Sequence, residues 1–143
     1  MNTKAKTENE AEIINPDQDL TINGETITVK EFRFKQAMTA AVTAADIVEE
    51  MRVLITDKGN DLHLTDIEGL FAKHWDAFIA LLSLSTGKDE VYLTELSDME
   101  GQSLMNSFWV VNSGFFMRRL MAAQLRARIQ PVEVSATGSS SQH

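Results

Sequence analysis

Residues 103–121, SLMNSFWVVNSGFFMRRLM, form an apolar segment around which the rest of this chain can be arranged. The apolar positions cover more than half the circumference of a helix: Leu104, Met105, Phe108, Trp109, Val111, Phe115, Phe116, Leu120 and Met121. A helix that is apolar nearly all round is central to a bundle or is buried by a partner. We therefore predict a central helix over residues 98–127, which begins at the capping box Ser97-x-x-Glu100. Gly114 lies in its middle at a cost of about 1 kcal/mol relative to alanine, which predicts a kink or a close packing contact.

Two more helices are predicted before this one. Residues 31–54 carry helical spacing at Phe34, Met38, Ala41, Ala45 and Val48. Residues 66–84 carry a clear amphipathic pattern, and Thr65-x-x-Glu68 forms a second capping box at its start. Thr86-Gly87 provides a stop with glycine in the left-handed cap position, and a short helix is predicted at 88–93.

A β-hairpin is predicted ahead of the helices, in DLTINGETITV (19–29). Asn23-Gly24 supplies the positive φ angles of a type I′ turn. A two-residue loop pairs Ile22 with Glu25 and Leu20 with Ile27, so that one face is apolar. A lone hairpin is marginally stable in water, so this face must cover helices or a partner.

The fold class that follows is mainly α, with a short N-terminal β-hairpin packed on a bundle of three principal helices and with disordered polar tails. The 143 residues fit one domain. We place that domain at 19–128. The polar segments 1–18 and 129–143 are predicted to be a disordered N-terminal tail and a flexible C-terminal tail.

Charge is distributed unevenly along the chain. The net charge is −8, but residues 1–100 carry 9 basic and 20 acidic groups, whereas residues 101–143 carry 4 and 1. The four basic groups are Arg118, Arg119, Arg126 and Arg128. A basic end on an acidic body can bind acidic partners or pair with the protein's own acidic surface. The overall acidity argues against nucleic-acid binding, and no window is apolar enough to predict a membrane span.

The sequence contains little that indicates catalysis. It has no cysteine, which excludes disulfides and thiol chemistry, and it has no phosphate-binding loop or nucleophile motif. His63 matches no metal-ligand spacing, and His74 and Asp76 point to different sides of a helix. His74 lies in an apolar stripe and is predicted to be a hydrogen-bonded core or boundary residue. We therefore expect a protein that is not an enzyme and that has neither a metal nor a cofactor.

The aromatic and methionine content of residues 105–121 is the most unusual feature. It has two interpretations: the aromatic residues form the core of a small bundle, or some line a groove for an apolar partner helix. A bundle of this size cannot easily bury every apolar position, which favours a groove or self-association into a dimer or larger assembly. The predicted partner-binding residues are Phe108, Trp109, Phe115, Phe116, Arg118 and Arg119.

Two segments resemble the tail assembly chaperones of tailed bacteriophages. GETITVKEFRFKQAM (24–38) is similar to the opening of that family, a short hairpin that enters a long helix. HWDAFIALLSLSTGKDEVYLTELSDMEGQSLMNSFWVVNSGFF (74–116) is similar to its second half, where a helix ends at Thr-Gly and a capped helix runs into an aromatic stretch. The resemblance covers about residues 19–122.

The resemblance implies a non-enzymatic protein of the host cell cytoplasm that is absent from the mature virion. Members of that family bind the apolar helical tape measure protein before the tail tube assembles and help to recruit the major tail tube protein. Two alternatives stay open: a minor structural or tail-completion protein of the virion, and a small regulatory protein that binds another partner.

Overall fold

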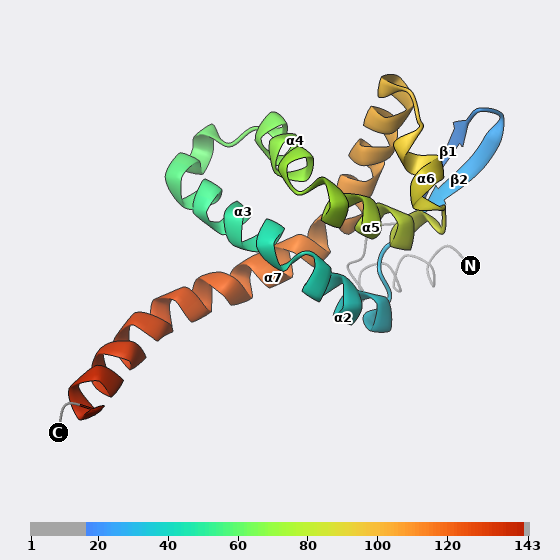
Figure 1. Ribbon diagram of the computed structural model, residues 1–143. Helices are drawn as coiled ribbons and strands as arrows, with labels where there is room; N and C mark the ends of the chain where they lie inside the picture. The colour runs from blue at the N-terminus through green and yellow to red at the C-terminus, as the bar shows by residue number, and fades with distance from the viewer. Residues whose placement is uncertain (1–16, 142–143) are drawn as a thin grey trace, which may run out of the picture.

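The computed structural model describes residues 17–141, and it describes side chains as far as Ile129. The elements, in chain order, are β1 (Gln18–Ile22), β2 (Glu25–Val29), α2 (Phe34–Thr43), α3 (Ala45–Lys58), a 3₁₀ turn (Gly59–Asp61), α4 (Leu64–Lys73), α5 (Trp75–Thr86), α6 (Glu90–Thr94) and α7 (Asp98–Ser141). The predicted fold class is confirmed, because a hairpin packs on a mainly helical body (Figure 1). The N-terminal tail lies almost wholly outside the described residues.

The hairpin has the predicted register. Leu20 pairs with Ile27 and Ile22 with Glu25, and Asn23 and Gly24 have φ angles of 54° and 76°. Ile22, Ile27 and Val29 are buried in the same core as the helices. The apolar face of the hairpin is therefore covered within the chain.

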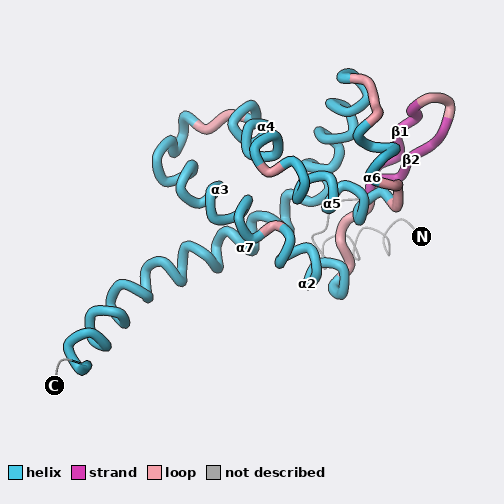
Figure 2. The backbone as a smooth tube through the Cα atoms, in the orientation of Figure 1, coloured by secondary structure: helices cyan, strands magenta, loops and turns pink. Residues whose placement is uncertain are grey.

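Two of the three predicted helices are each interrupted at a single residue (Figure 2). Ala44 separates α2 from α3 with φ −88° and ψ 1°, and His74 separates α4 from α5 with φ −108° and ψ 51°. The backbone groups of both break residues are paired. Ala44 N donates to Ala40 O and Ala44 O accepts from Val48 N, and His74 N donates to Leu70 O and His74 O accepts from Phe78 N.

The predicted inward face of the first helix is wrong at its start. Phe34 is 81% exposed and Met38 is 57% exposed, whereas Ala37, Ala40 and Ala44 are buried. The small alanine side chains let α2 approach α5 closely. Phe32, which lies just before the helix, fills the aromatic position instead.

Helix boundaries differ from the prediction where the capping groups differ. Helix α4 begins at Leu64 because Asp66 Oδ2 accepts a hydrogen bond from His63 N at 2.9 Å, so the predicted Thr65–Glu68 box is wrong. Helix α6 begins at Glu90 because Asp89 Oδ1 accepts from Val91 N at 2.8 Å. The left-handed cap at Gly87 is confirmed, with φ 74°.

Helix α7 begins at the predicted capping box: Ser97 N donates to Glu100 Oε1 at 3.0 Å, and Glu100 N donates to Ser97 Oγ at 3.2 Å. It continues to Ser141, past the predicted end at residue 127 and through most of the segment predicted as a flexible tail. In Figure 1 the helix bends along its length, and its C-terminal part projects beyond the other elements. A Cβ atom at Gly114 would meet only the Arg118 side chain, so a tight packing contact does not explain this glycine.

Candidate partner-binding surfaces

Three of the predicted partner-binding residues lie in the core. Phe108, Phe115 and Phe116 are each 0% exposed, so these three side chains are not part of the surface of the folded chain. The Phe116 ring centroid lies 5.0 Å from that of Phe115 and 6.0 Å from that of Phe71 on α4. The hairpin and helices α2 to α5 all contribute to the core on this side of α7. The aromatic residues there are therefore buried within the chain.

Trp109 is only partly buried, and its ring lies 5.6 Å from Phe116 and 6.3 Å from Phe71. It therefore covers the edge of the aromatic core. The alternative in which most aromatic residues form the core describes this part of the molecule.

The two predicted arginines differ in their surroundings. The Arg119 guanidinium lies 4.3 Å from the centre of the Phe115 ring, and Nη1 donates to Phe115 O at 3.4 Å. Burial, with a smaller effect of the Arg118 charge, lowers the pKa of Arg119. Arg118 is exposed and lies over Gly114. Arg118 is thus the one of the two that is presented to solvent.

The outer face of α7 carries a row of exposed apolar side chains, which we call the outer stripe. Its members recur every four residues: Met117 (37% exposed), Met121 (67%), Leu125 (57%) and Ile129 (48%). Arg118, Arg126 and Arg128 are exposed beside them. The sequence analysis missed Leu125 and Ile129, although the four-residue period beyond Met121 is a signal that could have found them.

A second exposed row lies on α2, at Phe34, Met38 and Val42, which are 81%, 57% and 79% exposed. It has the same four-residue spacing but is shorter. Scattered apolar side chains on a surface are normal, whereas two contiguous rows on helices indicate contact surfaces.

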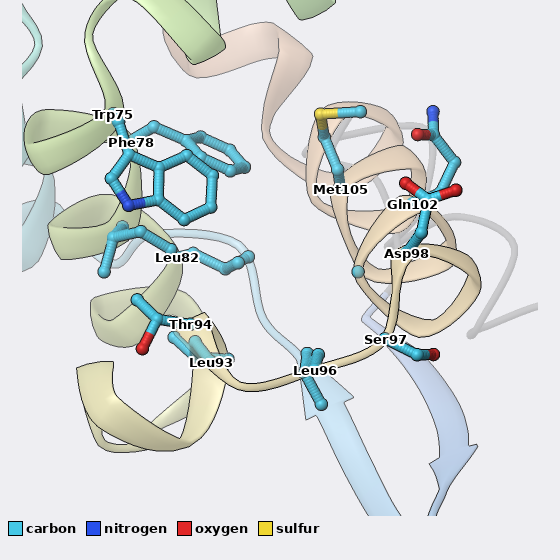
Figure 3. A pocket seen from close by; sticks show the side chains of 12 residues that line it. Trp75, Phe78, Leu82, Leu93, Thr94, Leu96, Ser97, Asp98, Gln102 and Met105 are labelled. Atoms are coloured by element: carbon cyan, nitrogen blue, oxygen red, sulfur yellow. The ribbon is translucent and has the colours of Figure 1, made fainter.

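A cavity of about 210 Å³ opens between α5, α6 and the first turns of α7 (Figure 3). Its apolar wall includes Trp75, Phe78, Leu82, Leu93 and Met105, and its polar edge includes Ser97, Asp98 and Gln102. Figure 3 shows the rings of Trp75 and Phe78 on one side and Met105 on the other. Gln102 Nε2 donates to Glu68 Oε2 at 2.7 Å, which brings a second carboxylate to this edge. The cavity has the size and polarity to accept one apolar side chain next to a cation.

The prediction for His74 is confirmed. Its Nε2 lies 2.9 Å from Glu50 Oε1, and its side chain is 19% exposed. Lys73 Nζ also contacts the Glu50 carboxylate, at 3.1 Å. Hydrogen bonds from Lys73 and then His74 lower the pKa of Glu50. This cluster joins α3 to the break between α4 and α5.

Within residues 17–141, no group of three histidine, aspartate or glutamate side chains is arranged to hold a metal ion. None of the helices in that range has a stretch that is long and apolar enough to cross a membrane. The outer stripe, the α2 row and the cavity are candidate contact surfaces of the described chain.

Residues 10–143 match a protein family of unknown function, DUF6631. The match covers nearly the whole sequence, so the chain belongs to this family. Comparisons with curated proteins and with solved structures gave no significant match.

Proposed function

We propose that this member of the DUF6631 family is a non-enzymatic tail assembly chaperone of a tailed bacteriophage. It binds apolar helical segments of the tape measure protein in the host cell cytoplasm and keeps them soluble until the tail tube forms. The resemblance of residues 24–38 and 74–116 to such chaperones supports this proposal. From the same resemblance we also propose that the chain helps to recruit the major tail tube protein and that it is absent from the mature virion.

The observation that carries the proposal is the outer stripe. Met121, Leu125 and Ile129 are each about half or more exposed to solvent, where α7 leaves the packed body. An amphipathic helix laid on such a row buries apolar side chains from both partners. Methionine adapts to different partner shapes, as a protein that binds many segments of one long client requires.

Charge adds selectivity to this surface. Residues 117–129 contain four arginines and no acidic residue. A client segment with aspartate or glutamate beside its apolar face would pair with the exposed Arg118, Arg126 and Arg128. The remaining acidic surface keeps the chaperone and its bound client in solution.

The test is co-expression with the tape measure protein encoded in the same genome, followed by a solubility assay and co-purification. The variant Met121→Ser/Leu125→Ser removes the centre of the outer stripe. We expect it to fold normally, because both side chains are exposed, and to lose client binding by about tenfold or more.

The control is Val53→Ser/Leu64→Ser, which removes two exposed apolar side chains, one from α3 and one from α4, that belong to neither exposed row nor to the cavity. We expect this variant to keep the client soluble. If both variants lost client binding equally, the cause would be general surface hydrophobicity and not the outer stripe. A client that stays insoluble with the native chain would contradict the proposal, and finding the chain in purified particles would favour a minor virion protein instead.

A further inference from the structure

Two surfaces of this chain are both apolar and carry opposite charges at their edges. The cavity between α5, α6 and α7 is apolar inside and has Asp98 and the Gln102–Glu68 pair at its edge. Residues 89–100, which include α6 and the start of α7, contain five acidic residues and no basic one. The outer stripe is a row of apolar side chains among arginines, with no acidic residue over 117–129.

The two surfaces cannot meet within one molecule. Asp98, Gln102 and Met105 line the cavity from the first turns of α7, and the outer stripe lies further along the same helix. At a rise of 1.5 Å per residue, Met105 and Leu125 are separated by roughly 30 Å of helix. In Figure 1 the C-terminal part of α7 also leads away from α5 and α6. Their complementarity can therefore be used only between two copies.

We propose that the outer stripe of one copy docks into the cavity of a second copy, with Met121 as the side chain that enters. Met121 is the most exposed member of the stripe, and its unbranched thioether suits a narrow apolar cavity. Arg118 lies one turn before it on the helix surface, and its guanidinium pairs with Asp98 at the cavity edge.

The contact joins two different surfaces, so it is heterologous. Each copy in a docked pair still has one empty cavity and one uncovered stripe, and a further copy can add at either end. The chain therefore assembles head to tail, into a ring or into an open series. This inference uses the stripe that the proposed function assigns to the client, but it requires no client.

The test is sedimentation of the purified full chain over a range of micromolar concentrations. We expect the average mass of the native chain to rise with concentration. Met121→Ser removes the docking side chain. Gly101→Leu fills the cavity, since a Cβ atom at Gly101 meets nothing within 4 Å. Each variant alone is expected to stay monomeric, because each lacks one half of the contact.

Mixing the two variants distinguishes this arrangement from others. The Met121→Ser chain keeps its cavity and the Gly101→Leu chain keeps its stripe, so an equal mixture should form a dimer and stop there. The controls are Val53→Ser and Gly69→Leu, an exposed valine on α3 and an unhindered helical glycine on α4, both outside the two surfaces of the contact. Both controls should assemble like the native chain.

A native chain that stays monomeric, a Gly101→Leu chain that still assembles, or a mixture that stays monomeric would overturn the inference. The outcome is separable from the proposed function. Loss of assembly with client binding intact leaves the chaperone proposal standing, and assembly without client binding leaves this inference standing.

Discussion

At the scale of single residues, Asn112 connects three segments that are distant in the sequence. Its Oδ1 accepts a hydrogen bond from Phe32 N at 3.0 Å, and its Nδ2 donates to Lys30 O at 3.2 Å and to Ser85 Oγ at 3.4 Å. Ser85 Oγ in turn donates to Lys30 O at 2.7 Å. Asn112 is 0% exposed, so these bonds replace water for the backbone that leaves the hairpin.

Replacing Asn112 should destabilise the fold. Asn112→Ala leaves the buried Phe32 N–H without its acceptor, and we expect the free energy of unfolding to fall by about 1–3 kcal/mol. Urea denaturation measures this change. Asn106→Ala is the control on the same helix, because Asn106 is exposed and alanine is the better helix former. A similar decrease in the free energy of unfolding of both variants would show that the Asn112 hydrogen bonds contribute little to stability.

Phe116 and Met121 separate core from surface on α7. Phe116→Ala empties a buried aromatic position and should lower the free energy of unfolding by about 3–5 kcal/mol. Met121→Ala, five residues later, should change stability by no more than about 0.5 kcal/mol, because its side chain is 67% exposed. Thermal unfolding of the two variants checks the difference. If Met121→Ala were as damaging as Phe116→Ala, the stripe would belong to the folded core.

The sequence indicates what a residue is more readily than what it contacts. The periodicity of α7 identified its apolar residues. It did not show which of them are buried, because the core residues and the outer stripe follow the same helical spacing. Which of them face inward depends on where α3, α4, α5 and the hairpin lie. The partners of Asn112 are more than 20 residues away along the chain, so no local pattern reveals them.

At the scale of elements, some helix ends with a local chemical cause were predicted, whereas the local cap at His63 and Asp66 and the breaks with a tertiary cause were not. Ser97, Glu100 and Gly87 define ends through their own hydrogen bonds or backbone angles. Ala44 interrupts a helix although alanine is the best helix former, so the break follows from packing. The order and type of the elements were therefore predictable, and the changes of direction were not.

Two glycines in helical segments should respond to alanine in opposite ways. Gly87 has φ 74°, where a Cβ atom is strained, so Gly87→Ala should cost about 1 kcal/mol. Gly69 lies within α4 with nothing within 4 Å of its Cβ position, so Gly69→Ala should stabilise by up to about 1 kcal/mol. The midpoints of urea unfolding curves measure both effects. Changes of the same sign would contradict the assignment of Gly87 as a cap.

Acid should loosen the junction between α3 and the α4–α5 break. The pKa of Glu50 is lowered in the folded state by hydrogen bonds from Lys73 and His74. A lowered pKa stabilises the fold above the unfolded value, about 4, and this contribution is lost as pH falls through the folded value. Glu50→Gln should therefore be less stable than the native chain at neutral pH.

The difference between Glu50→Gln and the native chain should narrow towards pH 3. Denaturation at the two pH values provides the measurement, and Glu95→Gln, an exposed glutamate after α6, is the control. A difference that stays constant with pH would mean that the Glu50 contacts do not depend on its charge.

At the scale of the whole molecule, charge separation is the property that the sequence and the structure describe alike. The acidic groups of residues 1–100 and the four arginines of α7 were visible in the sequence as counts, but the position of the exposed arginines beside the outer stripe required the fold. The candidate surfaces were only partly predictable for the same reason. Arg118 was identified from the sequence, whereas the cavity is built from three elements and has no signature in any of them.

Salt should weaken self-association if the contact between copies joins Arg118 to Asp98. Raising the sodium chloride concentration from about 0.05 to 0.5 M shortens the range of charge interactions. The average mass measured by sedimentation should therefore fall. Sodium sulfate at the same ionic strength provides a comparison, because it strengthens apolar burial. An average mass that did not fall in sodium chloride would show that the Arg118–Asp98 pair contributes little to the contact.

The spacing of the outer stripe also fixes how a helix can lie on it. A row of side chains four residues apart is inclined to its own helix axis, and two such rows interlock when the axes cross at about 50°. The row from Met117 to Ile129 is about 18 Å long, and crossing helices separate beyond such a distance. A helix that lay on the outer stripe in this way would be contacted over only a few turns, so the number of molecules needed to cover a longer helix would grow in proportion to its length.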